Sequence, residues 1–549
     1  MAERPPTPSA IVALEQQRHV KEPSPEPWSF RVWPQLPPEL AERIVGCLGR
    51  NDIAGTFRHL NKATVEHFSG PQHTLIRLSE PVPPHAFAAH WLTLGATRGL
   101  TLERRKDLVR LVAASGVLQT VELALQAAGF VGAVVVAFKA AAGAGQLPMC
   151  QWLWDHSSSR TEDPLDARSA EDALDAAAGG GHRHVCEWLL AIKTHQLRTG
   201  PVYAALRGGH ADLAEWLLQQ GPTLPIDDTH VYLCSMVYGC DLPTLQRAWL
   251  HFGTSLLGLD TKAAVLSSAA GSPTPDWAAK VEWLEAQGCP RSIEAAREAA
   301  GLPDHSKALA RLTWLLGRGY PANWGAVRAA VRNGNTSLLL HLLEEVPVGN
   351  VFEREEMMFR AVRGGHLAAL QALYAAGWPT YRAFSLLAAR HGHLHVLAWL
   401  LDTLGPAAVV LNAEFFAAAA ESGNMELLAW LRQHGCLWDC GAYSGAVGSG
   451  CAAVLEWLAE QGCPMEESGQ PYIRACRNGD LATARCLRRL GVPWGPDGRV
   501  FLAAAWEDFN PAPPPLLRWL LEEGCPEVVE EGLVGGEFLR LLGEDLGSG

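Results

Sequence analysis

Two histidine clusters are the densest groups of chemistry-bearing side chains in this chain of 549 residues. One is His182-Arg183-His184, and the other is His391-Gly392-His393 followed by His395. Neutral imidazoles bind metals and act as general bases near neutral pH, so either cluster is a candidate metal or catalytic site. Both clusters, however, lie on a Gly-His step that recurs along the chain. We therefore expect these histidines to have structural roles in turns.

Cysteines and glycines offer two further candidate motifs. Cys436 and Cys440 have a four-residue offset, with no second pair at the spacing of a zinc site. Gly179-Gly180-Gly181 is not followed by the Lys-Ser or Lys-Thr step that a phosphate-binding loop requires. The sequence signatures of serine hydrolases, zinc proteases and kinases are absent as well. We expect no enzymatic activity and predict no catalytic residue, no metal ligand and no cofactor.

Four tryptophans are candidates for contacts with a partner. Trp324, Trp378, Trp438 and Trp494 each follow a glycine that ends an apolar, helix-like run. Exposed aromatic side chains are frequent hot spots of protein–protein interfaces, so these four are the predicted contact residues. Packing of each ring beneath a neighbouring loop is the alternative for the same position.

The elements that position these side chains come from one phrase that the chain repeats. It consists of small residues, a Gly-X step and an apolar run that ends in Trp-Leu, with the tryptophan six residues after X. Clear copies are Gly181-His182…Trp188, Gly209-His210…Trp216, Gly392-His393…Trp399, Gly423-Asn424…Trp430 and Gly450-Cys451…Trp457. Successive copies are about 26–36 residues apart, which is the spacing of solenoid repeats.

Residues 381–405 illustrate how one copy is expected to fold. The segment from Tyr381 to Arg390 is rich in good helix formers, and Gly392 supplies the left-handed residue that ends such a helix. Apolar residues from Leu394 onward then recur at helical spacing and predict a second, amphipathic helix. Two short helices cannot bury Trp399 by themselves, so each copy needs a neighbour on both faces. We therefore expect the tryptophan to be the buried anchor of each repeat.

Helix–turn–helix units at this period, with Gly-His between the helices and Gly-Cys-Pro after the second, resemble ankyrin repeats. The resemblance extends from about Leu102 to Pro526 and implies an all-α, ankyrin-type α-solenoid of about 13–14 helix pairs. The usual Thr-Pro-Leu-His opening is absent, and several copies are too short for a β-hairpin, so simple loops are expected between repeats. An α-solenoid of another family is the alternative. In either case each repeat is expected to contact only its neighbours.

A different unit precedes the array, over residues 31–70. Leu40, Ile44 and Leu48 recur at i, i+4 and i+8, which is one face of a helix that Pro37-Pro38 can start. This segment is similar to the F-box, a small helical domain that docks on the Skp-type adaptor of cullin–RING ubiquitin ligases. Thr64 stands where the family usually has a tryptophan. The resemblance implies these adaptor-docking residues: Leu36, Pro37, Leu40, Ile44, Leu48 and Ile53.

Composition sets the remaining expectations. Residues 1–30 are Pro-rich and predicted to be disordered, 71–101 to connect the two units, 102–526 to form the array, and 527–549 to be an acidic cap or tail. A net charge of −13 and the lack of a basic stripe with interleaved aromatics predict no nucleic-acid partner. No apolar stretch resembles a signal peptide or a membrane span, so we expect no membrane partner and a cytoplasmic or nuclear location. The 13 cysteines fall largely on repeat positions and are expected to be reduced structural thiols.

These features predict a non-catalytic scaffold for protein–protein recognition. Protein partners would bind the concave face and the inter-repeat loops of the array. The F-box-like segment would make the chain a substrate-receptor subunit of a cullin–RING ubiquitin ligase. The alternative is an interaction scaffold with no ubiquitin link, whose N-terminal helices only cap the array. Exposure of Leu40 and Ile44 would favour the receptor, whereas burial of both would favour the cap.

Overall fold

A computed structural model of the chain describes residues 38–526, apart from 61, 94, 160–164, 193–196, 222–227, 253–257, 348, 406–408, 497 and 507–511. This part of the chain consists of helices joined by turns and contains no strand. None of its helices is long and apolar enough to cross a bilayer. The chain divides into two compact units, Met1–Phe87 and Ala88–Gly549. The tails predicted for residues 1–30 and 527–549 lie outside the described residues.

The first unit is a group of short helices around a small apolar core. Its elements are α3 (Pro38–Val45), α4 (Arg50–Gly55), the 3-10 turn η2 (Phe57–His59), α5 (Lys62–His67), α6 (Pro71–Thr74) and the start of α7 (Pro84–Trp91). Val45, Ile53 and Phe68 form the core. The buried Asn51 side chain both donates to the Arg77 carbonyl and accepts from the Arg77 N–H, each at 2.8 Å. The first unit therefore includes part of the segment that was expected only to connect it to the array.

The second unit is an array of fourteen described helix pairs. The first helices of the pairs are α8 (Leu102–Ala114), α10 (Ala133–Gly143), α12 (Ala167–Gly179), α14 (Gly200–Arg207), α16 (Thr229–Gly239), α18 (Leu259–Gly271), α20 (Ile293–Ala300), α22 (Trp324–Arg332), α24 (Val351–Arg363), α26 (Arg382–Arg390), α28 (Ala413–Ala420), α30 (Gly441–Ser449), α32 (Gln470–Arg477) and α34 (Arg499–Trp506). The second helices are α9 (Leu118–Ala128), α11 (Leu147–Ser159), α13 (Arg183–Ile192), α15 (Ala211–Gln219), α17 (Leu242–Phe252), α19 (Trp277–Ala286), α21 (His305–Gly317), α23 (Thr336–Glu345), α25 (Leu367–Ala375), α27 (Leu394–Leu404), α29 (Met425–Gln433), α31 (Ala452–Glu460), α33 (Leu481–Arg489) and α35 (Pro514–Glu522). The predicted all-α helical repeat array is confirmed.

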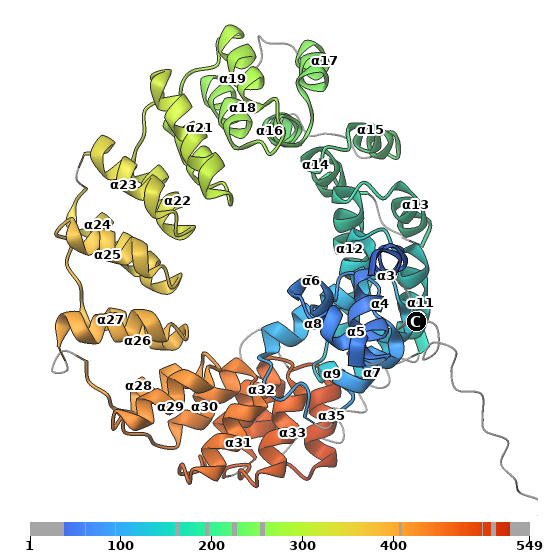
Figure 1. The fold of residues 1–549 in the computed structure, drawn as a ribbon, viewed down its shortest axis with the longest axis vertical. Helices are drawn as coiled ribbons and strands as arrows, with labels where there is room; N and C mark the ends of the chain where they lie inside the picture. Colours follow the sequence, from blue (N-terminus) through green and yellow to red (C-terminus); the bar gives the residue numbers. More distant parts are fainter. Residues whose placement is uncertain are drawn as a thin grey trace, which may run out of the picture. The chain divides into compact units, whose positions relative to one another are not determined.

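The helix pairs pack side by side along the array (Figure 1). Neighbouring first helices are in contact from α8 to α34, whereas close contact between neighbouring second helices is found mainly at α21–α23, α23–α25 and α31–α33. Because the first helices lie closer together than the second helices, the array curves toward the first helices. The side chains of the first helices that point away from the second helices therefore form the concave face.

The turn inside a pair follows the Gly-X step, as Gly392-His393 shows. Gly392 has a φ of 75°, a left-handed conformation that disfavours any residue with a Cβ. The N–H of His393 then donates to the Ala388 carbonyl at 2.9 Å and ends the first helix. Ala388 and Ala389 are fully buried, and their small side chains let the first helices of adjacent repeats approach closely.

The Trp-Leu step buries its leucine more completely than its tryptophan. In Trp399-Leu400, Trp430-Leu431 and Trp457-Leu458 the leucines are 0 % exposed, while the tryptophans are only partly buried at the edge of the core. The leucine lies on the same helical stripe as the buried residues three and four positions before it. In these three repeats the anchor is therefore the leucine that follows the predicted tryptophan. The α17 copy is the exception, because Trp249 is 2 % exposed and Leu250 is 83 % exposed.

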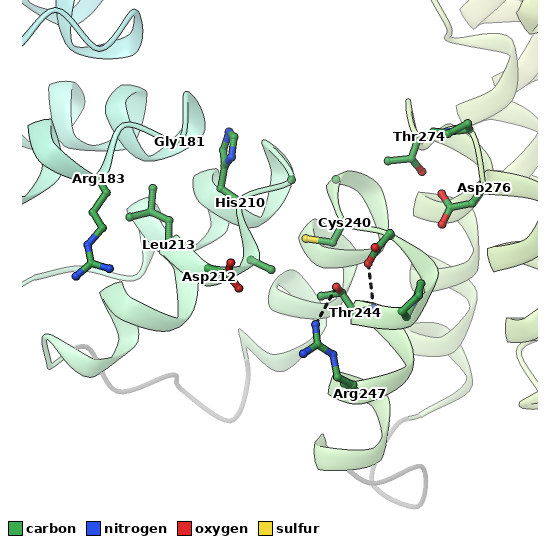
Figure 2. A pocket seen from close by; sticks show the side chains of 16 residues that line it. Gly181, Arg183, His210, Asp212, Leu213, Cys240, Thr244, Arg247, Thr274 and Asp276 are labelled. Atoms are coloured by element: carbon green, nitrogen blue, oxygen red, sulfur yellow. Dashed lines mark hydrogen bonds between the residues drawn. The ribbon is translucent and has the colours of Figure 1, made fainter.

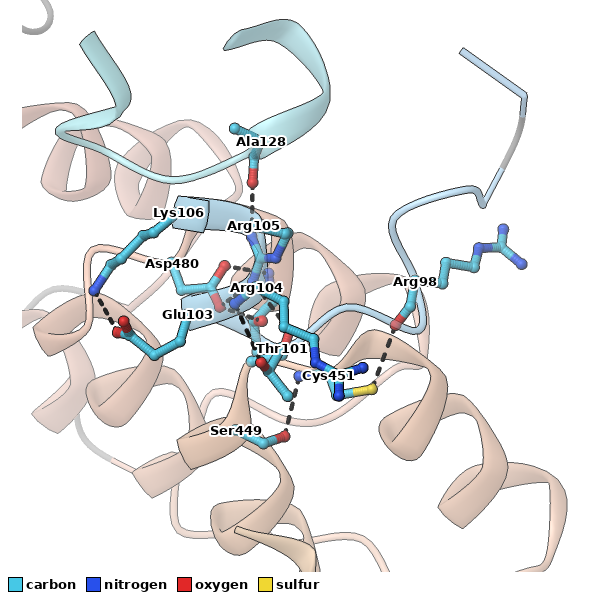
Figure 3. Close-up of polar contacts among 12 residues, drawn as sticks. Arg98, Thr101, Glu103, Arg104, Arg105, Lys106, Ala128, Ser449, Cys451 and Asp480 are labelled. Atoms are coloured by element: carbon cyan, nitrogen blue, oxygen red, sulfur yellow. Dashed lines mark hydrogen bonds and ion pairs between the residues drawn. The ribbon is translucent and has the colours of Figure 1, made fainter. Parts of the chain in front are cut away.

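The first repeat of the array meets the α30/α31 and α32/α33 repeats near the other end, in a contact that we call the seam. Arg105 on α8 and Asp480 at the start of α33 form an ion pair of 2.6 Å, with side chains that are 2 % and 0 % exposed. The Arg105 guanidinium also donates to the carbonyls of Ala128 at 2.8 Å and Gly450 at 3.0 Å (Figure 3). The buried Arg105 side chain thus binds a residue that lies 375 positions away in the sequence.

Backbone hydrogen bonds extend the seam on both sides of this ion pair. The Val131 N–H donates to the Gly479 carbonyl at 2.9 Å, and the Ala482 N–H donates to the Gly129 carbonyl at 2.7 Å. Near α31, the Ala453 N–H donates to the Arg98 carbonyl at 2.9 Å. The seam departs from the expectation that each repeat contacts only its neighbours, because the first repeat packs on the turns of the α30/α31 and α32/α33 repeats.

One repeat lacks the Gly-His step, and a buried lysine side chain holds its inter-helix turn instead. Lys280 on α19 is 0 % exposed, at a position where most other second helices carry a buried apolar residue and α21 carries the buried Arg311. Its Nζ donates to the Val237 carbonyl at 2.9 Å and to the hydroxyls of Ser272 at 3.1 Å and Thr274 at 2.7 Å. Burial lowers the pKa of Lys280, and the carboxylate of Asp276 at 3.6 Å opposes that effect. Lys280 therefore ties the 271–276 turn to the end of α16.

Lys280→Met is expected to lower the free energy of unfolding by about 1–3 kcal/mol, because it keeps the volume but leaves buried oxygens without their donor. Urea unfolding should show the loss, and hydrogen exchange should rise in residues 237–242 and 270–276. Lys307→Met is the matched control, since the Lys307 side chain is 74 % exposed and its ion pair is at the surface. Equal unfolding midpoints for the two variants would contradict the role of Lys280.

Candidate functional site

The apolar stripe predicted to dock on an adaptor lies at the surface of the first unit. Leu40, Ile44 and Leu48 are 44 %, 45 % and 38 % exposed. Leu40 and Ile44 lie on α3, and Leu48 follows it in a turn closed by the Leu48 N–H and the Val45 carbonyl at 2.9 Å. The amphipathic helix buries Val45 in the core and leaves the stripe to the solvent. Two of the predicted residues, Leu36 and Pro37, lie outside the described residues.

Ile53 requires a correction among the predicted docking residues. It is 5 % exposed and packs with Val45 and Phe68, so it stabilises the unit and presents no docking surface. Thr64, at the place of the usual tryptophan, is also buried, and its hydroxyl donates to the Arg58 carbonyl at 3.0 Å. The stripe available for docking therefore consists of Leu40, Ile44 and Leu48.

The four candidate contact tryptophans pack against aromatic or cationic neighbours in the array. Trp378 is 4 % exposed, and its ring centre lies 5.6 Å from that of Trp324 at a tilt of 47°, so its ring is not available to a partner. The Arg432 guanidinium lies 3.8 Å from the ring centre of Trp438. Trp494 lies 4.1 Å from the ring of Tyr472. Burial withdraws Trp378 from the predicted contact residues, whereas Trp324, Trp438 and Trp494 are only partly buried and stay predictions.

The histidine clusters connect neighbouring repeats through backbone carbonyls. Nε2 of His393 donates to the Arg363 carbonyl at 2.9 Å, and Nε2 of His395 donates to the Gly365 carbonyl at 2.8 Å. His184 makes the equivalent bond to the Gly145 carbonyl at 3.0 Å. A carbonyl only accepts, so each Nε2 must carry the hydrogen and is not a free metal ligand. Burial lowers the pKa of His393, which favours this neutral form near pH 7.

All 13 cysteines are free thiols, and ten of them are buried. Burial raises the pKa of Cys436 and Cys463 to about 11, so these thiols stay protonated and unreactive near neutral pH. Cys440, the second member of the spaced pair, is exposed. No three His, Cys, Asp or Glu side chains converge as metal ligands within the ranges that the structure describes.

One hollow, with a cavity volume of about 1000 Å³, lies over the inter-helix turns of four successive repeats (Figure 2). Arg183 and Arg247 line it together with three carboxylates, among them Asp241 and Asp276. Asp276 accepts from the Leu242 N–H at 2.7 Å, which engages that carboxylate at the start of α17. The lining carries both positive and negative side chains, and some of these already hydrogen-bond to the turns. This hollow therefore shows no preference for either an anionic or a cationic ligand.

A second hollow, which we call the basic hollow, lies on the concave face at the ends of the five first helices α14 to α22. Its cavity volume is about 510 Å³. It is lined by Arg207, Tyr238, Gly271, Arg297, Glu298, Gly301, Leu302, Pro303, Gly325, Arg328, Ala329 and Arg332. Four arginines and one carboxylate therefore surround it, in a chain whose net charge is −13.

The basic hollow forms because the residue at one equivalent position, near the end of each first helix, is large in some repeats and glycine in others. Five consecutive repeats place Arg207, Tyr238, Gly271, Gly301 and Arg332 directly after a buried residue in the last turn of the first helix. Glycines in the two middle repeats leave space, and the longer side chains on either side form its walls. No local sequence motif marks this site, because its members are spread from residue 207 to residue 332. The sequence signal is the residue that follows the buried position at the end of each first helix.

No protein-family model and no curated protein matches the chain. Among solved structures, the chain is similar to the pentatricopeptide repeat protein PPR10 from maize, at 11 % identity over 85 % of this chain and 77 % of that chain, with a TM-score of 0.25. It is also similar to PPR10 in complex with an 18-nt psaJ RNA element, at 13 % identity over 85 % of this chain and 87 % of that chain, again with a TM-score of 0.25. No family model and no curated protein supports the ankyrin or F-box assignments.

The exclusion of nucleic acid as a partner is corrected here. The similar PPR10 chain was determined with bound RNA. The exclusion relied on the absence of a basic stripe in the linear sequence, and the folded array gathers four arginines at the basic hollow, so the exclusion is not retained. In the folded array, arginines from separate repeats gather on the concave face, and linear order does not reveal such a group.

Proposed function

We propose that the chain is a non-catalytic recognition scaffold that serves as a substrate-receptor subunit of a cullin–RING ubiquitin ligase. The first unit docks on a Skp-type adaptor, and the array binds the protein to be modified. The observation that carries this proposal is the exposed stripe of Leu40, Ile44 and Leu48 on and after α3.

Two physical arguments support docking at this stripe. Leu40 and Ile44 are one helical turn apart, so they present a continuous apolar strip of the kind that a partner helix or groove covers. The unit keeps a core of its own in Val45, Ile53 and Phe68 and does not need the stripe for its folding.

The array is proposed to be of the ankyrin type, with loops in place of the hairpins between repeats. In support, most pairs have a tight Gly-X turn and closely packed first helices rich in small residues, as in Ala388-Ala389…Gly392. The 13 free thiols fit a reducing compartment, so the proposed location is the cytoplasm or the nucleus.

Replacing both Leu40 and Ile44 by Asp is expected to abolish co-purification of a Skp-type adaptor with the full chain. Each carboxylate would have to be desolvated inside an apolar contact, at a cost of several kcal/mol. Helical content and melting temperature should stay near those of the wild type, because both positions are exposed. The measurement is affinity purification of the tagged chain from cells, followed by identification of the adaptor by mass spectrometry.

The matched control replaces Leu75 and Ile76 by Asp, since both are exposed apolar residues of the same unit, at 66 % and 43 %. This variant should retain the adaptor. If the wild type retains no Skp-type protein, or if the Leu40/Ile44 variant melts early, the scaffold without a ubiquitin link is the correct alternative.

A further inference from the structure

The basic hollow has the chemistry of an anion site, and its walls show how an anion would be held. The Arg207 guanidinium lies 4.1 Å from the ring centre of Tyr238, so the aromatic face supports the cation from one side. A stacked guanidinium keeps its N–H groups at the edge of the plane, where they can donate to a ligand. On the opposite wall, Arg332 takes part in no ion pair that the described residues reveal.

The other charged residues of the hollow are already paired. Arg297 donates to Glu298 at 3.0 Å, which engages the one carboxylate of the lining. Arg328 donates to Glu356 at 3.1 Å. The surplus positive charge of the hollow therefore comes from Arg207 and Arg332, which stand on its two sides with Gly271 and Gly301 between them.

We propose that the basic hollow binds the phosphate of a phosphorylated serine or threonine in a partner protein. This inference rests on the proposed role of the array in binding a substrate protein. A phosphate monoester carries about −1.5 to −2 charges and three acceptor oxygens, so it can accept from arginines on two sides at once. A single carboxylate has less charge and fewer acceptors to bridge the same walls.

The surroundings of the hollow favour a single phosphate over a long run of phosphates. Further along the concave face, Glu356 pairs with Arg360 at 2.7 Å. Glu421 pairs with Arg390 at 3.1 Å and with Arg474 at 3.0 Å. Each of these two carboxylates serves two arginines, since Glu356 also accepts from Arg328, so carboxylates interrupt the positive charge along this face. A short phosphorylated segment can avoid these carboxylates, whereas an extended nucleic-acid strand would bring its phosphates against them.

The test measures binding of the full chain to a fluorescent peptide pool with a central phosphoserine and randomised flanks. The same pool with an unmodified serine and a single-stranded RNA oligonucleotide are the comparison probes. We expect the phosphorylated pool to bind most tightly, because charge-assisted hydrogen bonds to the two arginines need the phosphate.

Three variants locate the binding to the hollow. Arg332→Ala and Arg207→Ala should each weaken binding of the phosphorylated pool by about 10–100-fold, since each removes a charged donor. Gly301→Leu fills the hollow without changing its charge and should weaken binding similarly. Gly301 has a φ of −79° and an added Cβ would meet only carbonyls of its own helix turn, at 3.4 and 3.5 Å, so this variant should fold. Arg382→Ala, at an exposed position of α26, is the control and should bind like the wild type.

Several outcomes would overturn the inference. Equal binding of the serine and phosphoserine pools would remove the role of phosphate. Wild-type affinity in both Arg332→Ala and Gly301→Leu would place the site elsewhere. Tighter binding of RNA than of the phosphorylated pool, with the same dependence on Arg207 and Arg332, would make the hollow a nucleic-acid site. Adaptor co-purification is scored separately, so loss of phosphopeptide binding with the adaptor retained sinks this inference alone.

Discussion

Replacing Arg105 by alanine is expected to open the seam and to lower the free energy of unfolding by about 3–5 kcal/mol, as the loss of one partner from a buried ion pair does. The Asp480 carboxylate, which is 0 % exposed, would remain buried without its cation. The carbonyls of Ala128 and Gly450 would lose a donor in the same step. The individual repeats should stay folded, since the substitution leaves their own helix pairs intact.

Small-angle scattering of the full chain should report the opening as a larger radius of gyration. Hydrogen exchange should rise in residues 98–131 and 450–489, the two sides of the seam. Asp480→Asn should act in the same direction with a smaller effect, because asparagine keeps the N-cap bond to the Thr483 N–H and removes only the charge. Arg104→Ala, at the exposed neighbouring position, should change neither quantity. A wild-type radius with full protection at the seam in Arg105→Ala would show that the ion pair does not hold the ends together.

Leu431→His is expected to lower the free energy of unfolding by about 3–5 kcal/mol, from a lost apolar contact and a buried polar ring. The same replacement one residue earlier, Trp430→His, should cost only about 1–2 kcal/mol. The chain itself places His341, Ala372 and Cys486 at the tryptophan position. A leucine follows each of them and is fully buried in every case.

Urea unfolding of the two histidine variants compares the same new side chain at a buried and at a partly buried site. Hydrogen exchange should show the damage of Leu431→His in α28–α31, because coupling between repeats falls off beyond the nearest neighbours. If Trp430→His were as destabilising as Leu431→His, the tryptophan would be the anchor after all.

The seam also bears on the proposed binding surface. The basic hollow is formed by residues of five successive first helices, most of them in the last turns, so its width depends on the rotation between repeats. Joining Arg105 to Asp480 limits that rotation, because the ends of the array can meet only at one curvature. Phosphopeptide binding by the basic hollow should therefore weaken when the seam is opened.

The sequence by itself determined the features that are local to one repeat. The roles of Gly392 as a helix terminator and of His393 as part of a turn follow from residue types at fixed spacing, and the structure shows both. The all-helical array follows from the same phrase, because a helix pair with one apolar stripe must stack on a copy of itself. The amphipathic pattern also marked Leu40 and Ile44 as one face, although it could not say which way that face turns.

Only the tertiary structure decided the features that depend on accumulated geometry. Arg105 meets Asp480 because small rotations add up over the array, and no local pattern records their sum. The neighbours of Trp378, which bury its ring, come from another repeat, so its exposure was beyond local prediction. The basic hollow depends on Gly271 and Gly301 lying side by side between Arg207 and Arg332. Residues far apart in sequence form a site only when the first helices pack against one another, because that packing, and not the local sequence, sets the distances between them.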